Sequence, residues 1–217
     1  MITTRQMIFS CSSLLILTLA SCGAPAPQAT PQVVTVYSTS AAQPWLGGMY
    51  SCAGSSAVIS RVDDPSVADL ILRVGEPEYL DVPAYQIDTE EILLVTHRQS
   101  PVQNLALEEA RALFMGFGDA QASVRVWVYA DGEDVQEVFD RSVMDGRNVT
   151  SLAWVAASPQ KMSDALVNEP NSIGILPRHW KTGDVRDVYS VAEVPVLVLT
   201  RSEPAGVLRE LLSCLQK

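Results

Sequence analysis

The chain has 217 residues and a formal net charge of −10, and 47% of its residues are hydrophobic. Because this apolar content is enough for a packed core, the composition excludes an intrinsically disordered chain. The acidic excess argues against a nucleic-acid partner, since phosphate backbones select basic surfaces.

The N-terminal segment has the layout of a secretory signal peptide. Arg5 precedes an apolar run at residues 7–20, and small residues then lead to Cys22. The run is shorter than the roughly 20 apolar residues that cross a bilayer, and serines interrupt it. We therefore expect residues 1–21 to be removed as a signal peptide, with a retained transmembrane helix as the weaker alternative.

The expected cleavage site indicates a lipid anchor. Leu19-Ala20-Ser21-Cys22 resembles the lipobox of bacterial lipoproteins, in which the cysteine thiol receives a diacylglyceryl group before cleavage. The resemblance implies that membrane lipid on Cys22 holds the protein at the extracytoplasmic face of a bacterial membrane, periplasmic or cell-surface, because two acyl chains anchor a protein stably. Cleavage to a free secreted domain is the alternative.

Residues 22–32 comprise this cysteine and a predicted tether rich in alanine, proline and glutamine. At about 3.1 Å per residue for a proline-rich extended segment, the ten residues after Cys22 span about 30 Å. The folded part is then residues 33–217, a length that suits one compact unit or two small lobes.

Two of the four cysteines, Cys11 and Cys22, are accounted for by the signal peptide and the lipid. In an oxidising exported setting, the remaining Cys52 and Cys214 are most simply a disulfide, worth about 5 kcal/mol by loop-closure entropy. Such a bridge brings the two ends of the folded part together. The alternative is two separate buried thiols.

Short apolar runs alternate with segments of helical periodicity along the folded part, which favours an α/β fold. In chain order we expect a strand at 33–37, a helix at 43–52, strands at 57–62, 69–74 and 92–96, a helix at 107–115, a strand at 124–129, helices at 133–143 and 159–166, strands at 173–176 and 195–200, and a helix at 203–215.

This order of segments resembles the type 2 periplasmic solute-binding proteins, most closely the phosphate-binding-protein-like branch of ABC importers. The first strand, ligand loop and first helix of that family are similar to residues 33–40 followed by Pro44-Trp45-Leu46. Three later stretches carry the resemblance further: Ala68-Asp69-Leu70-Ile71-Leu72, residues 105–116, and Ser172-Ile173-Gly174-Ile175-Leu176-Pro177.

The resemblance implies a two-lobed, Venus-flytrap fold in which each lobe is a mixed sheet flanked by helices. Lobe one would be residues 33–96 plus 185–217, and lobe two would be residues 97–184. A small-molecule ligand would sit in the cleft between the lobes and pass to an ABC permease. The bridge between Cys52 and Cys214 would then join the first and last helices of lobe one.

Lobe one offers Ser38, Thr39 and Ser40 as candidate ligand-binding residues. They sit where the first helix should begin, and a helix start presents unpaired backbone N–H groups beside such hydroxyls. The alternative is that one of these hydroxyls merely caps the helix.

Lobe two departs from the family's pattern. Phosphate binders place an arginine shortly before a Ser-Gly-Thr trio, and counting back from Phe139 puts that trio at Glu133-Asp134-Val135, with Tyr129 at the arginine position. Asp131, Glu133 and Asp134 would repel an oxyanion. We therefore expect a neutral or cationic solute, or none, and not phosphate. Acidic residues at a helix start also stabilise the helix by themselves, which is the alternative role.

Other candidates carry less weight. Ser158 could face the cleft from lobe two, although it also suits the N-cap of the next helix. His97 and His179 have no ligand-spaced neighbours, so we expect no metal site. The sequence has no G-x-S-x-G, P-loop or H-E-x-x-H motif, so we expect no catalytic residue and no cofactor. Our hypothesis is a solute-binding lipoprotein, and its rival is a surface or scaffold lipoprotein that keeps the fold without binding a ligand.

Overall fold

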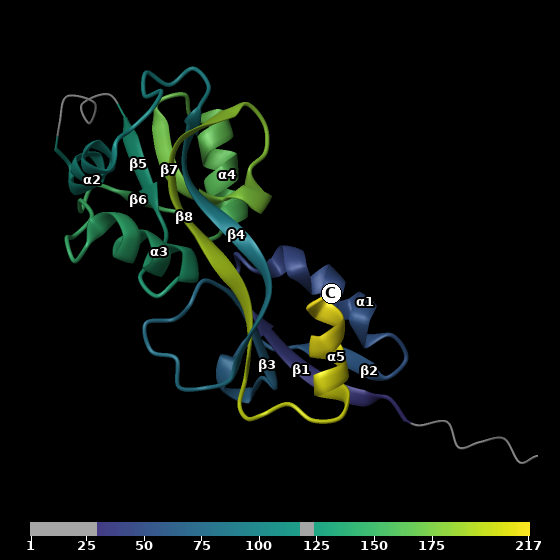
Figure 1. Ribbon diagram of the computed structural model, residues 1–217. Helices are drawn as coiled ribbons and strands as arrows, with labels where there is room; N and C mark the ends of the chain where they lie inside the picture. Colours follow the sequence, from purple (N-terminus) through teal and green to yellow (C-terminus); the bar gives the residue numbers. More distant parts are fainter. Residues whose placement is uncertain (1–29, 118–123) are drawn as a thin grey trace, which may run out of the picture.

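The computed structural model describes residues 30–117 and 124–217, so the expected signal peptide, Cys22 and most of the tether lie outside the described residues (Figure 1). These residues form an α/β fold around an eight-stranded sheet with the order β2-β1-β3-β8-β4-β7-β5-β6. The predicted fold class is confirmed. Within these two ranges, no helix combines the length and the apolar character that crossing a membrane requires.

The strands are β1 (Gln32–Ser38), β2 (Ala57–Arg61), β3 (Leu70–Val74), β4 (Ala84–His97), β5 (Arg125–Val128), β6 (Trp154–Val155), β7 (Ser172–Pro177) and β8 (Val185–Thr200). The α-helices are α1 (Leu46–Ala53), α2 (Leu107–Met115), α3 (Asp134–Phe139), α4 (Pro159–Asn168) and α5 (Val207–Leu215). Short helical turns are η1 (Gln43–Trp45), η2 (Pro65–Val67), η4 (Asp140–Met144) and η5 (Arg178–Trp180).

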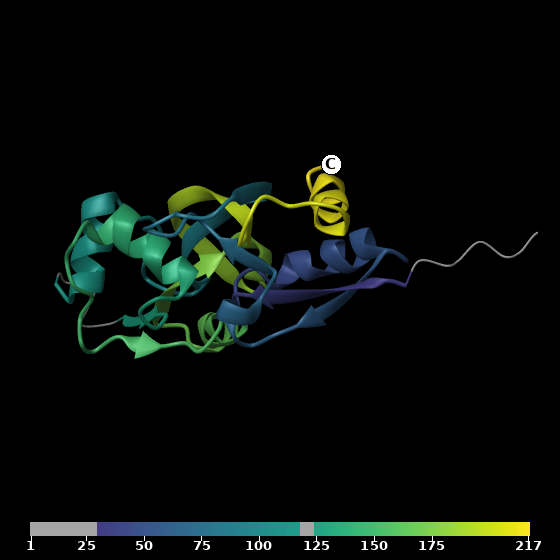
Figure 2. The ribbon, with the colours of Figure 1, turned by 90° about the horizontal axis from the view of Figure 1, so that it is seen from below.

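We call the half built from β1, β2, β3, α1 and α5 lobe one. Strand β1 pairs in parallel with β2 and β3, and β3 pairs antiparallel with β8. Alternate residues of β3 and of the middle of β1 are fully buried, as expected for strands with one face toward a core. Figure 2 shows α1 over β1, with α5 beside α1.

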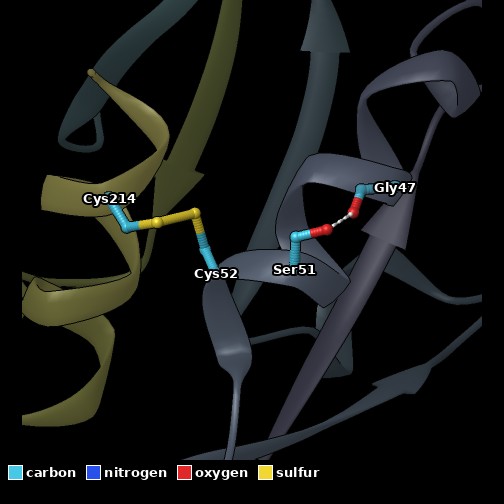
Figure 3. The surroundings of a disulfide bond; sticks show 4 residues. All are labelled: Gly47, Ser51, Cys52 and Cys214. Atoms are coloured by element: carbon cyan, nitrogen blue, oxygen red, sulfur yellow. Dashed lines mark hydrogen bonds between the residues drawn. A yellow bond between two sulfur atoms is a disulfide. The ribbon is translucent and has the colours of Figure 1, made fainter.

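The disulfide predicted from cysteine counting is present and joins α1 to α5 in lobe one (Figure 3). The Cα atoms of Cys52 and Cys214 lie 5.7 Å apart across a sequence separation of 162 residues. The last helix is therefore fastened to the first.

We call the half built from β5, β6, β7, α2, α3 and α4 lobe two. Its central strand β7 is buried at all six residues, as expected for a strand covered on both faces. Gly174 of β7 allows α4 to approach closely, because a Cβ at this position would collide with the sulfur of Met162 and lie 3.2 Å from Cβ of Trp127.

Strands β4 and β8 run through both halves and join them into one sheet (Figure 1). The ladder between them is irregular at three places, between Gln86 and Asp88, between Ile92 and Leu93, and between Leu94 and Val95. Residues 92–96 of β4 pair with β7 of lobe two. The expected boundaries between the lobes, at residues 96/97 and 184/185, therefore fall at the lobe-two ends of β4 and β8, the two strands that both lobes share.

Candidate functional site

The loop after β1 brings Thr39 to the junction between the lobes. Its backbone N–H donates to the carbonyl of Leu72 at 3.0 Å, which fixes the loop against β3. Its hydroxyl accepts from the backbone N–H of Ala42 at 3.4 Å and donates to Oδ2 of Asp134 at 2.6 Å. The Thr39 side chain therefore reaches from lobe one to the start of α3 in lobe two.

Asp134 receives three donors and is 2% exposed. Besides the Thr39 hydroxyl, its Oδ2 accepts the backbone N–H of Val74 at 2.9 Å, and its Oδ1 accepts the N–H of Val135 at 2.9 Å. Two of the three donors come from lobe one. A carboxylate of lobe two thus completes the hydrogen bonding of the loop after β1 and of the end of β3.

Contacts around this carboxylate hold α3 against β3. Arg73 Nη2 and Glu137 Oε2 form an ion pair at 2.6 Å across the junction. Gly75 has a φ of +74°, and a Cβ there would lie only 2.8 Å from Cγ2 of Val138, so the close approach needs glycine. Nearer the solvent, the Ser40 hydroxyl donates to Glu133 Oε2 at 3.2 Å.

Aromatic residues form another contact between the lobes. The ring centroids of Trp45 from lobe one and His179 from lobe two lie 4.6 Å apart. Trp180 Nε1 donates to the carbonyl of Ala41 at 2.9 Å, which is a further hydrogen bond across the junction. His179 Nδ1 lies 2.7 Å from Oε2 of the buried Glu90. The lobes therefore touch at these residues as well as at the Asp134 carboxylate.

Burial and nearby acidic side chains shape the electrostatics around the Asp134 carboxylate. Burial raises the pKa of Asp134, while the hydrogen bonds from Thr39 and Val74 oppose that change. Burial, followed by the nearby charges of Asp134 and Glu133, raises the pKa of Tyr129 well above its ordinary value. The Tyr37 pKa is raised by burial and by the same two acids. A free anion here would meet like charge.

The structure places the other predicted site residues as follows. The Ser38 hydroxyl donates to the neighbouring carbonyl of Thr39 at 3.0 Å. Tyr129 is buried, and its hydroxyl has no hydrogen-bond partner among the described residues. Asp131 is exposed and lies near Asp140, whose pKa is raised first by burial and then by charges that include Asp131. Ser158 caps α4 by accepting the N–H of Lys161 at 3.3 Å.

Thr39, Ser40 and Glu133 are thus brought together, and Ser38 and Ser158 engage local backbone groups instead. Sequence reasoning did not find Val74, because a backbone N–H at a strand end has no side-chain signature. It also did not find the pairing of Arg73 with Glu137, because that contact exists only once α3 docks on β3.

Two cavities lie along the junction, each lined from both sides. One, of about 330 Å³, is lined by Pro44, Trp45, Gly48, Ile87, Asp88, His179 and Leu215. The other, of about 440 Å³, is lined by Glu78, Glu137, Asp140, Arg141 and Gly146. Neither lining includes Thr39 or Asp134.

Comparisons with known proteins bear on the fold. No protein-family model and no curated protein matches the chain. Among solved structures, a protein from Clostridium perfringens assigned as the substrate-binding component of a phosphate ABC transporter, with bound phosphate, is 14% identical with a TM-score of 0.71, covering 84% of this chain and 92% of its own. An ABC-type phosphate transport receptor from Vibrio cholerae is 14% identical with a TM-score of 0.65, covering 85% and 93%.

Regulatory proteins share the architecture too. A C-terminal domain assigned to the LysR family of transcriptional regulators from Rhodococcus sp. RHA1 is 13% identical with a TM-score of 0.64, covering 86% of this chain and 100% of its own. Likeness at this identity shows the fold alone. The chain has the type 2 periplasmic-binding-protein-like fold, which occurs in both binding and regulatory proteins.

Proposed function

We propose that the protein is a lipid-anchored extracytoplasmic solute-binding protein that closes on a small neutral or cationic ligand and delivers it to an ABC permease. The observation that carries the proposal is the half-exposed Glu133 carboxylate, which accepts from the Ser40 hydroxyl between two lobes joined by β4 and β8. The lipobox-like segment ending at Cys22 supports the anchor. The likeness to phosphate-transport receptors supports a binding role.

The chemistry of the junction favours a cation over an anion. Glu133 is half-exposed and accepts from Ser40, which leaves further acceptor capacity on its carboxylate. Tyr37 and Tyr129 lie close enough to Glu133 and Asp134 for the charges of these acids to raise the pKa values of both tyrosines. Carboxylates beside aromatic rings suit an ammonium or guanidinium group.

Thermal unfolding of the mature protein against amines, amino acids, sugars and phosphate tests this function. A ligand that binds only the folded state at about 100 times its dissociation constant adds about 2.7 kcal/mol, which moves the midpoint by a few degrees. We expect such a shift with an amine or a neutral solute. A comparable shift with phosphate would contradict the assignment of ligand class.

The anchor is tested separately in cells. Metabolic labelling with palmitate should mark the wild-type protein and leave Cys22→Ser unlabelled, with the variant released from the membrane fraction. Labelling of both proteins would contradict lipidation at Cys22.

A scaffold lipoprotein without a ligand is the second candidate, and the direct bonds from Thr39 and Val74 to Asp134 favour it. These bonds hold the lobes together through protein atoms alone. This candidate would be supported over solute binding if no compound in the panel shifts the unfolding midpoint and the immobilised mature chain retains a partner protein.

A further inference from the structure

We propose that Asp134 is a built-in ligand, whose carboxylate fills an anion-binding position formed by Thr39, Val74 and Val135 and thereby holds the two lobes together. The inference goes beyond the proposed function and depends neither on solute binding nor on the lipid anchor.

The donor set is that of an oxyanion site. One hydroxyl and two backbone N–H groups converge on the carboxylate at 2.6, 2.9 and 2.9 Å. They come from three segments: the loop after β1, the end of β3, and α3 itself. Because the Thr39 hydroxyl already accepts from the N–H of Ala42, its own hydrogen is free to point at Asp134. An ionised carboxylate only accepts, so the donors and the acceptor match.

Capping of α3 does not explain the arrangement. The bond from Val135 to Oδ1 is local and is what a residue at a helix start makes for itself. The two bonds to Oδ2 are long-range, with sequence separations of 95 residues for Thr39 and 60 for Val74. A carboxylate that only capped α3 would not need partners in the other lobe.

Burial makes the hydrogen bonds essential. Asp134 is 2% exposed, and the nearby Arg73 already forms an ion pair with Glu137. An isolated buried carboxylate is unfavourable unless donors compensate for the lost water. Reciprocally, removing the carboxylate leaves the Thr39 hydroxyl and the Val74 N–H without their acceptor. The consequence is a closed junction that excludes an external oxyanion for as long as Asp134 is in place.

Chemical rescue tests the proposal on the mature chain purified in detergent. Asp134→Ala removes a carboxylate and leaves a space lined by three donors, and formate is the smallest anion that can refill it. We expect the variant to unfold several degrees below the wild type, and formate at tens of millimolar to restore at least half of that loss. Sodium chloride of equal ionic strength should restore little.

Two controls define the specificity of the rescue. Asp140→Ala removes a half-buried acid that accepts from Gln136 within lobe two, so formate should not raise its midpoint. Amide hydrogen exchange should show the Val74 N–H protected in the wild type, at least tenfold faster to exchange in Asp134→Ala, and slower again with formate.

Thr39→Val and Thr39→Ser keep the proposal testable if Asp134→Ala does not fold. Valine removes the hydroxyl with little change of shape, and serine retains it. We expect faster exchange at Val74 with valine and near-wild-type protection with serine. Equal behaviour of the two Thr39 variants, absence of formate rescue, or undiminished Val74 protection in Asp134→Ala would overturn the proposal.

Discussion

Where the loop after β1 and the end of β3 meet the start of α3, the two lobes contribute complementary hydrogen-bonding groups. Lobe one presents donors, the Thr39 and Ser40 hydroxyls and the Val74 N–H, as expected for a loop that holds an anion. Lobe two presents acceptors, the Glu133 and Asp134 carboxylates, at the positions where the resemblance to phosphate binders leads one to expect further donors. The donors of one lobe satisfy the acceptors of the other, so a few residues at the start of α3, and not the fold, determine the chemistry of this contact.

The lobes also differ in how they are held together. Lobe one has a covalent link between α1 and α5, whereas α3 and α4 of lobe two pack on β7. Replacing Cys52 and Cys214 by alanine should lower the free energy of unfolding by about 5 kcal/mol if loop-closure entropy dominates. Denaturant titration measures this, and amide exchange should rise in α5 before α4. Uniform loosening of both lobes would contradict the comparison.

Close packing of α3 on β3 can be broken at one glycine. Gly75→Ala places a Cβ 2.8 Å from Val138 Cγ2 at a φ of +74°. We expect a loss of about 2–4 kcal/mol from backbone strain and overpacking. Gly47→Ala in α1 is the matched control, since its Cβ would meet nothing within 4 Å. Helix propensity predicts a gain of about 0.5 kcal/mol for the control, measured by the same titration.

The ion pair across the junction should matter more than one within lobe two. Glu137→Gln removes the charge facing Arg73, whose side chain is 13% exposed, and we expect a loss of about 1 kcal/mol. Glu108→Gln removes the partner of Arg111, but Glu108 is 76% exposed, and such pairs contribute about 0–0.5 kcal/mol. Thermal unfolding of both variants distinguishes these effects, and an equal loss would show that the Arg73 pair does not hold the lobes.

The smallest expected effect is on the pH dependence of stability, which distinguishes Asp134 from the carboxylates of Asp88 and Glu91 in β4. A hydrogen bond from Trp45 lowers the pKa of Asp88, and hydrogen bonds from Ser190 and then Arg178 lower the pKa of Glu91. The stability that these two carboxylates contribute is therefore lost as the pH falls. Burial raises the pKa of Asp134, so the opposite sign applies: stability falls as the pH rises from its ordinary value of 3.8 toward its folded-state value.

Comparison of Asp134→Asn with the wild type isolates that contribution. The wild-type midpoint minus the variant midpoint should decrease as the pH rises from about 3.8. Thermal unfolding in steps of half a pH unit measures the difference. Parallel curves for the two proteins would exclude a raised Asp134 pKa.

Features were predictable from the sequence where they have a local residue pattern or follow from the number of residues of one type. Strand β1 was predicted from a short apolar run, and the disulfide was predicted from two cysteines left unexplained by the signal peptide and the lipid. Sequence reasoning predicted only residues 92–96 of β4 and 195–200 of β8. In β4, the polar residues Asp88, Thr89 and the buried Glu90 interrupt the apolar pattern before residue 92. The contact of Asp134 with Val74 was out of reach, since it depends on how one lobe docks on the other.

Calorimetric titration of phosphate into two proteins tests the central claim most directly, that acceptors at the start of α3 have replaced the donors of an anion site. The proteins are the wild type and a variant that restores the trio, Glu133→Ser with Asp134→Gly and Val135→Thr. We expect no binding heat with the wild type and measurable binding with the variant, because the freed Thr39 hydroxyl and Val74 N–H gain new donors beside them. Phosphate binding to the wild type as tight as to the variant would contradict the account.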